Sequence, residues 1–317
     1  MRVVMMGTGA FAEPTFLALL DSRHQVAGLV TNPDRPSGKE REMVRHIKQL
    51  AVERGVPVFQ PESINTPEGV AGLRAFAPEI LVVAAYGQIL SAEVLEVPPR
   101  GGINVHASLL PKYRGAAPID WAIYHGEKQT GVTIIRMSTR LDAGDMLAQE
   151  ALDILPDETT GELEARLAPL GARLALQVLD QIEAGTARGQ KQDQSLVTKA
   201  PKLKKEHGLI DWSRSAELVC CQIRAMQPWP TAYTYWHRPG KPPLRLIVLR
   251  ASPQPTAAPA MPGTVVAASA EQVAVAAGAG SVSLLTVQPA GKKPMPIADF
   301  LRGHLVQVGD RFGSETL

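Results

Sequence analysis

Two side chains that could take part in chemistry, Asn104 and His106, lie two residues apart. Asn104 stands within a short run, residues 102–105, that is otherwise typical of a buried strand, and His106 follows it directly. Alternate residues of a strand share one face. A carboxamide and an imidazole would therefore stand side by side where a parallel sheet usually carries only apolar groups. Burying either without a partner costs about 1–3 kcal/mol. Ligands bind where such strands end in open α/β sheets, so the pair predicts a functional site.

A third polar group, Asp142, lies in a turn rich in Asp and Gly that follows the next predicted strand, residues 131–137. Because loops that follow parallel strands meet at one edge of the sheet, we expect Asp142 to approach the pair. A carboxamide can donate to a developing oxyanion, an imidazole can move a proton near neutral pH, and a carboxylate can orient the imidazole. Together they suit acyl transfer between nitrogens.

The sequence carries neither a Gly-x-Ser-x-Gly elbow nor a Cys-His pair, so it predicts direct attack by a substrate amine and no covalent acyl-enzyme. Residues 108–111, Ser-Leu-Leu-Pro, follow the strand directly. An apolar segment with a proline suits the wall of a pocket for a flat heterocycle. The alternative is an ordinary rigid loop.

Apolar runs and helical periodicities alternate through the first half of the chain, which predicts a doubly wound parallel sheet of the Rossmann-like α/β class. The segment at residues 36–49 is charged and is either a loop or the start of a helix that runs to Gly55. Residues 159–162 carry the capping-box pattern ahead of the helix expected at residues 163–182. We expect strands at residues 2–6, 25–30, 56–59, 80–85, 102–105 and 131–137, and helices at residues 14–20, 68–76, 116–124 and 163–182.

The turn at residues 7–12, Gly-Thr-Gly-Ala-Phe-Ala, matches G-x-G-x-x-A between a strand and a helix. This pattern is typical of a dinucleotide site, in which Asp34 would bind the ribose. The prolines at 33 and 36 argue instead for a rigid turn that Asp34 caps. We therefore expect no NAD.

The second half of the chain has a different character. Short β-type segments separated by Gly and Pro follow one helix at residues 213–226, which predicts a small OB-like β-barrel or a sandwich. We expect a catalytic domain at residues 1–188, a basic linker at 189–206, and a β-barrel domain at 207–317. The expected strands lie at residues 232–236, 244–249, 263–266, 273–276 and 282–287.

Charge is distributed unevenly between the two halves. From residue 189 onward there are 15 Lys and Arg against 8 Asp and Glu, while the first 188 residues hold 18 against 23. A basic second half suggests a polyanionic partner. Plain surface charge for solubility explains the same numbers equally well.

The remaining composition favours a cytoplasmic protein. No apolar run approaches the roughly 20 residues of a membrane span, and the first residues read as a strand and its turn, so we expect no leader segment. The two cysteines, Cys220 and Cys221, are adjacent and suit small apolar positions in a helix. Their spacing excludes a disulfide framework and offers no metal site.

The segment NVHASLLPKYRGAAPI, with TGVTIIRM and LDAGDM after it, resembles the 10-formyltetrahydrofolate-dependent formyltransferases. The resemblance extends to VVMMGTGAFA, VTNPDRPSG, PVFQPESI and VVAAYGQIL in the first half of the chain. In the second half, IDWSRSA, IRAMQPWPTAY and QPAGKKPM are similar to the members of that family that act on methionyl-tRNA rather than to those that modify sugars. The family commonly has Gly-Thr-Pro in the first turn, where this chain has Gly9, and its loop after PDRP is usually less acidic.

The resemblance implies transfer of a formyl group from 10-formyltetrahydrofolate to the α-amine of methionine on initiator tRNA. It implies that Asn104, His106 and Asp142 are catalytic. It also implies that other residues bind the folate and the tRNA. We expect the protein to be a monomer. The folate contacts would be Ser108, Leu109, Leu110 and Pro111, and the tRNA contacts Lys39, Lys202, Lys204 and Lys205.

Three other functions fit parts of the sequence. A formyltransferase for an amino-sugar nucleotide would keep the three catalytic residues but would need no basic barrel. A dinucleotide-dependent oxidoreductase would rest on Gly7 and Gly9. An RNA-binding protein without activity would rest on the barrel, and the intact catalytic residues argue against it.

Overall fold

The computed structural model describes residues 1–34, 39–238, 240–255 and 260–316, and for residues 39–45 it describes the backbone alone. The chain divides into two compact units. The first comprises Met1–Pro118, Gln129–Asp153 and Leu163–Pro201, and the second comprises Ile119–Lys128, Ile154–Glu162 and Lys202–Leu317. The division at residues 1–188, 189–206 and 207–317 stays a prediction.

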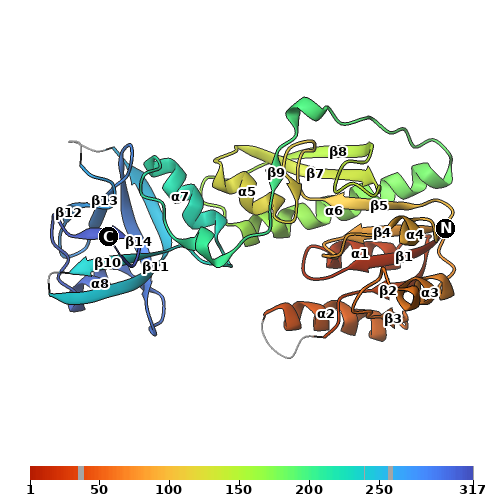
Figure 1. Cartoon of the computed structure of the whole chain (residues 1–317), viewed down its shortest axis with the longest axis horizontal. Coiled ribbons are helices and arrows are strands. Elements are labelled where there is room, and N and C mark those ends of the chain that lie inside the picture. Colours follow the sequence, from red (N-terminus) through yellow and green to blue (C-terminus); the bar gives the residue numbers. More distant parts are fainter. Residues whose placement is uncertain (35–38, 239, 256–259, 317) are drawn as a thin grey trace. The chain divides into compact units, whose positions relative to one another are not determined.

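The first unit is built on a seven-stranded sheet with the order β3-β2-β1-β4-β5-β7-β8 (Figure 1). The five strands from β3 to β5 in this order run parallel. All five residues of β4 are buried, as expected of a strand covered on both faces. The strands are β1 (Arg2–Gly7), β2 (Gln25–Val30), β3 (Val58–Phe59), β4 (Ile80–Ala84), β5 (Gly102–His106), β7 (Gln129–Arg136) and β8 (Met146–Asp153).

The last two strands depart from the sequence prediction. β7 was expected to extend the parallel sheet, but it runs antiparallel to β5, and β8, which was not predicted, runs antiparallel to β7. The register pairs His106 at the end of β5 with Thr133 and Ile103 near its start with Arg136. The chain therefore enters β7 at the edge of the sheet where β5 ends. From that edge, β7 can extend along β5 only in the opposite direction.

Helices follow the parallel strands in alternation. They are α1 (Glu13–Leu20), α2 (Lys39–Glu53), α3 (Pro67–Ala75) and α4 (Ala92–Leu95), with α5 (Pro118–Tyr124) and α6 (Thr160–Glu183) later in the chain. The charged segment is thus helical from Lys39 onward, and residues 35–38 lie outside the described residues. The capping box ahead of α6 is confirmed, because Thr159 N donates to Glu162 Oε2 at 2.9 Å and Glu162 N to Thr159 Oγ1 at 3.4 Å.

One face of the sheet beside β5 is covered by α6. A Cβ placed on Gly171 of α6 would lie 2.6 Å from Val105 Cγ1 and 3.5 Å from Val132 Cγ1, so the helix axis can approach the strands only because this residue is glycine. Val105 points toward α6. Its neighbours Asn104 and His106 therefore face the other side of the sheet.

The second unit holds an antiparallel sheet with the order β12-β13-β14-β11-β10-β16, and β15 pairs with β14. The sheet curls, because Val265 N donates to Asp310 O at 2.9 Å and Phe312 N donates to Gly263 O at 2.7 Å across its two ends. Its strands are β10 (Tyr233–Arg238), β11 (Lys241–Gln254), β12 (Val265–Ala268), β13 (Val273–Ala276), β14 (Ser281–Pro289), β15 (Met295–Pro296) and β16 (Arg311–Gly313).

Two helices pack against this curled sheet. α7 (Ala216–Ala225) contacts β11, and α8 (Ile297–Gly303) contacts β14. Buried Trp236, Phe300 and Phe312 form an aromatic core, with ring centroids 5.9 Å apart for Trp236 and Phe300 and 6.5 Å for Trp236 and Phe312. The predicted fold class, a Rossmann-like α/β unit followed by a small β-barrel unit, is confirmed in a parallel-dominated first sheet and a second sheet that curls into a half-barrel. Among the described helices, none is long and apolar enough to cross a membrane.

Candidate active site

The strand β5 carries two of the predicted catalytic residues on one face. Parallel pairing with β4 sets Asn104 opposite Val83, and antiparallel pairing with β7 sets His106 opposite Thr133. His106 is 5% exposed, and Asn104 is half-buried. The two polar groups thus open onto the face that α6 does not cover, as the spacing predicts.

Asp142 completes the group. Its Oδ1 accepts from Asn104 Nδ2 at 3.4 Å, its Oδ2 lies 3.6 Å from His106 Nδ1, and the backbone N–H of Gly115 donates to Oδ2 at 2.9 Å. The side chain is 9% exposed. The structure therefore brings the carboxamide, the imidazole and the carboxylate together.

The expected reason for this proximity was wrong. The loop between β7 and β8 starts at the edge where β5 begins, not where it ends, because β7 is antiparallel. Asp142 reaches its neighbours because the loop folds back over the face of the sheet. Two backbone features shape this loop. Asp142 has a left-handed conformation, with φ of 47°, and the backbone at Gly144 passes close to that of Arg136. A Cβ on Gly144 would lie 1.7 Å from the carbonyl oxygen of Arg136.

The imidazole of His106 is held on its other side. Nε2 lies 3.0 Å from the carbonyl oxygen of Tyr113. A carbonyl only accepts, so Nε2 carries the hydrogen in this contact. This leaves Nδ1 as the nitrogen that faces Asp142 and can take up a proton.

Residues 108–111 form a turn that several hydrogen bonds hold within the protein. Ser108 Oγ donates to Lys112 O at 2.7 Å, and Thr133 Oγ1 donates to Ser108 O at 2.6 Å. Leu110 N donates to the same Thr133 hydroxyl at 3.1 Å. Ser108 and Leu110 are buried, while Leu109 and Pro111 stay partly exposed.

The predicted tRNA contacts lie elsewhere in the chain. Lys202, Lys204 and Lys205 are exposed residues of the second unit, and they precede or begin the short 3₁₀ turn Lys205–Gly208. Lys39 is the first residue of α2, and its side chain lies outside the described part of the structure.

Sequence reasoning did not single out several residues that support the site. Gln192 donates to the carbonyl oxygens of Asp142 and Gly144, and Arg114 donates to Gln192. Arg114 and Gly115 stand within the motif that follows His106, which was a usable signal. Gln192 lies in a polar segment without any pattern, so nothing in the sequence distinguished it.

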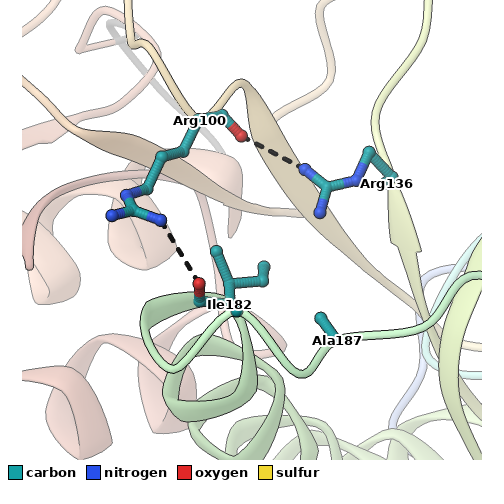
Figure 2. A pocket seen from close by; sticks show the side chains of 5 residues that line it. Arg100, Arg136, Ile182 and Ala187 are labelled. Carbon is teal, nitrogen blue, oxygen red and sulfur yellow. Dashed lines mark hydrogen bonds between the residues drawn. The ribbon is translucent and has the colours of Figure 1, made fainter.

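A separate pocket of the first unit is lined by Arg100, Arg136, Ile182, Gly185 and Ala187 (Figure 2). Arg100 Nη1 donates to Ile182 O and Arg136 Nη1 donates to Arg100 O, each at 3.2 Å. None of the predicted site residues lines this pocket. Within the described residues, no group of three or more His, Cys, Asp and Glu side chains is placed to hold a metal ion.

Comparisons with known proteins connect this geometry to a family. The formyl transferase family matches residues 1–179, and the formyl transferase C-terminal domain matches residues 202–305. Proteins named methionyl-tRNA formyltransferase are 44% identical over 314 residues in Solibacter usitatus, covering 99% of both chains, and 42% identical over 314 residues in Bacillus subtilis, covering 98% of both. A third, from Citrifermentans bemidjiense, is 42% identical over 316 residues and covers 99% of this chain and 97% of the relative.

Solved structures share the fold at low sequence identity. HypX from Aquifex aeolicus in complex with tetrahydrofolic acid superposes with a TM-score of 0.62 at 19% identity, over 97% of this chain and 48% of that one. The sugar 3N-formyl transferase WlaRD superposes with a TM-score of 0.65 at 15% identity, over 92% and 99%. From the two domain matches and the full-length relatives, we conclude that this chain belongs to the formyl transferase family.

Proposed function

We propose that this chain transfers the formyl group of 10-formyltetrahydrofolate to the α-amino group of methionine esterified to initiator tRNA. The observation that carries the proposal is the meeting of Asn104, His106 and Asp142 on one face of β5 in a formyl transferase. The names of the full-length relatives at 42–44% identity support methionyl-tRNA as the acceptor.

The chemistry follows from the hydrogen bonds available at the site. An α-amino group has an ordinary pKa of about 7.7–8.0, so part of it is a free nucleophile at neutral pH. The amine attacks the formyl carbon, and Asn104 Nδ2 donates to the oxyanion that develops. His106 Nδ1 accepts the proton that leaves the amine and returns it to N10 of the folate as the old carbon–nitrogen bond breaks. The carbonyl oxygen of Tyr113 orients the imidazole through Nε2, and Asp142 stabilises the charged form once Nδ1 has taken up the proton.

Residues 108–111 would form a wall for the folate ring system. Leu109 and Pro111 are partly exposed and can offer apolar side-chain contacts, while buried Ser108 and Leu110 hold the turn in shape. The bound tetrahydrofolic acid named for one structural relative supports a folate as formyl donor.

The basic residues of the second half of the chain would bind the tRNA backbone. Exposed Lys202, Lys204 and Lys205 suit phosphate contacts, which position a nucleic acid without reading its sequence. We propose the same role for Lys39 and, more broadly, for the β-barrel that follows residue 206. We further propose that the protein works as a monomer in the cytoplasm, where charged tRNA is available.

A formylation assay tests the function. Charged initiator tRNA, charged elongator methionyl-tRNA and a dTDP-amino sugar are each incubated with the protein and 10-formyltetrahydrofolate. We expect formyl transfer to initiator methionyl-tRNA and a KM for tRNA that rises steeply with salt, because phosphate contacts release counterions. Transfer to the sugar alone, or a KM that salt does not change, would contradict the proposal.

A further inference from the structure

A segment of the predicted linker, residues 189–200, lies against the two loops that flank the catalytic residues, and we call this segment the strap. All of it belongs to the first unit, together with both loops. At one end, Gln190 and Met146 exchange two backbone hydrogen bonds of 2.8 Å beside the loop that carries Asp142. The strap is therefore hydrogen-bonded to the first unit beside the loop of Asp142.

The other end of the strap holds the loop that contacts His106. The short strand β6 (Arg114–Gly115) pairs in parallel with β9 (Lys199–Ala200), which Figure 1 labels within the strap. Arg114 N donates to Thr198 O at 2.9 Å, and Tyr113 N donates to Thr198 Oγ1 at 2.8 Å. Tyr113 offers its carbonyl to His106, and Gly115 offers its N–H to Asp142. The strap thus contacts the segment, residues 113–115, that forms hydrogen bonds with His106 and Asp142.

The central contact of the strap is the carboxamide of Gln192, which is 6% exposed. Its Nε2 donates to Asp142 O at 2.7 Å and to Gly144 O at 2.8 Å. Its Oε1 accepts from Arg114 Nε at 3.0 Å and from Arg114 Nη2 at 2.7 Å. All its donors and lone pairs are used, and only a carboxamide of this length supplies both kinds of group.

Arg114 determines which way this amide points. A guanidinium only donates, so the oxygen of Gln192 must face Arg114 and the nitrogen must face the loop. Burial lowers the pKa of Arg114, and the nearby charge of Asp142 acts against this. The carboxylate of Asp142 and the loop that carries it are therefore linked to Arg114 both through Gln192 and through charge.

The loop needs such a support. Asp142 has a backbone φ of 47°, a conformation that costs a residue other than glycine roughly 1 kcal/mol. Its contacts with Asn104 and His106, at 3.4 and 3.6 Å, are long enough that a small displacement would break them. Gln192 binds the carbonyl of Asp142 itself and that of the residue two positions later.

We propose that Gln192 is a positioning residue for catalysis, which together with Arg114 fixes the loop so that the Asp142 carboxylate meets His106 and Asn104. The proposal rests on the proposed function, because it assigns to Gln192 an effect on that reaction. Gln192 touches no reacting atom and acts through Asp142.

The test compares Gln192→Leu, which keeps the size and loses every hydrogen bond, with Gln192→Glu, which still accepts from Arg114 but cannot donate to the two carbonyls. Gln190→Leu is the matched control, because the Gln190 side chain is exposed and the strap uses only its backbone. Formylation of initiator methionyl-tRNA is measured at saturating concentrations of both substrates. We expect kcat to fall about ten- to a hundredfold in both Gln192 variants, KM values to change less than threefold, and the control to match the wild type.

A double-mutant cycle with Asp142→Asn separates positioning from general damage. If Gln192 acts through Asp142, Gln192→Glu will lower kcat by less than threefold in a chain that already carries Asp142→Asn. A kcat within twofold of wild type in Gln192→Glu, or an equally large loss in the Asp142→Asn background, would overturn the inference. An inactive wild-type protein would instead count against the proposed function.

Discussion

Replacement of Asn104 by Asp and by Ala offers a graded test of the oxyanion role. Alanine removes the Nδ2 donor and introduces no charge. Removing one donor to an oxyanion typically costs about a hundred- to a thousandfold in kcat. Aspartate keeps the size of the side chain and loses the same donor, so it should show at least this loss.

The Asp variant carries a second penalty that the structure allows us to estimate. Asn104 Nδ2 lies 3.4 Å from Asp142 Oδ1, and aspartate would place a carboxylate oxygen at that point. Two unit charges at this separation repel by about 5 kcal/mol at an effective dielectric constant of about 20, which is an upper bound for a half-buried pair. Asn104→Asp should therefore unfold at a lower temperature than Asn104→Ala at pH 7.

The assay is formyl transfer to initiator methionyl-tRNA with both substrates saturating, next to thermal unfolding followed by circular dichroism. KM for tRNA should stay within threefold of wild type in both variants, because Asn104 is assigned to the transition state rather than to tRNA binding. A kcat for Asn104→Ala within threefold of wild type would refute the oxyanion assignment. An Asp variant as stable as the Ala variant would refute the charge geometry.

Two further predictions concern groups away from the reaction. Burial raises the pKa of Glu164, whose carboxylate accepts from the backbone N–H of Phe11, so the folded chain loses stability as pH rises from the ordinary Glu value toward the raised one. The Glu164→Gln variant keeps the hydrogen-bond acceptor and removes the charge. Thermal unfolding should show that this variant is more stable than the wild type at pH 7 and equally stable below about pH 4. A gain in stability that does not depend on pH would contradict this reasoning. Burial raises the pKa of the Cys220 thiol to about 12, and the residue is 8% exposed. Peptide mass spectrometry should find Cys220 unmodified by iodoacetamide at pH 8 until the protein is unfolded, and rapid alkylation of the folded protein would show that the thiol is accessible.

The sequence was sufficient for the parts of the site that local periodicity determines. The alternation of residues in β5 placed Asn104 and His106 on one face, and the apolar run of β4 indicated a strand covered on both sides. The capping box at Thr159 and Glu162 was equally local, since each residue supplies the hydrogen-bond partner of the other.

Local periodicity could not predict the contacts between segments that are distant in the sequence. The direction of β7 depends on where the chain returns to the sheet, which no residue of the strand encodes, and the approach of Asp142 was therefore expected for the wrong reason. Gln192 lies 50 residues from Asp142 in a segment with the composition of a linker. The four hydrogen bonds of its carboxamide, from which we infer a positioning role, form only in the folded chain.

Formyl transfer by the His106→Ala variant tests most directly whether His106 carries the proton in this reaction. Labelled 10-formyltetrahydrofolate and charged initiator tRNA are mixed with wild-type or variant protein, and labelled N-formylmethionine is recovered after the ester is hydrolysed. From the proposed mechanism we expect rapid labelling by the wild type and a kcat about a hundred- to ten-thousandfold lower in the variant, because the variant lacks the proton-transferring group. Labelling by His106→Ala at the wild-type rate, or no labelling by the wild type, would contradict it.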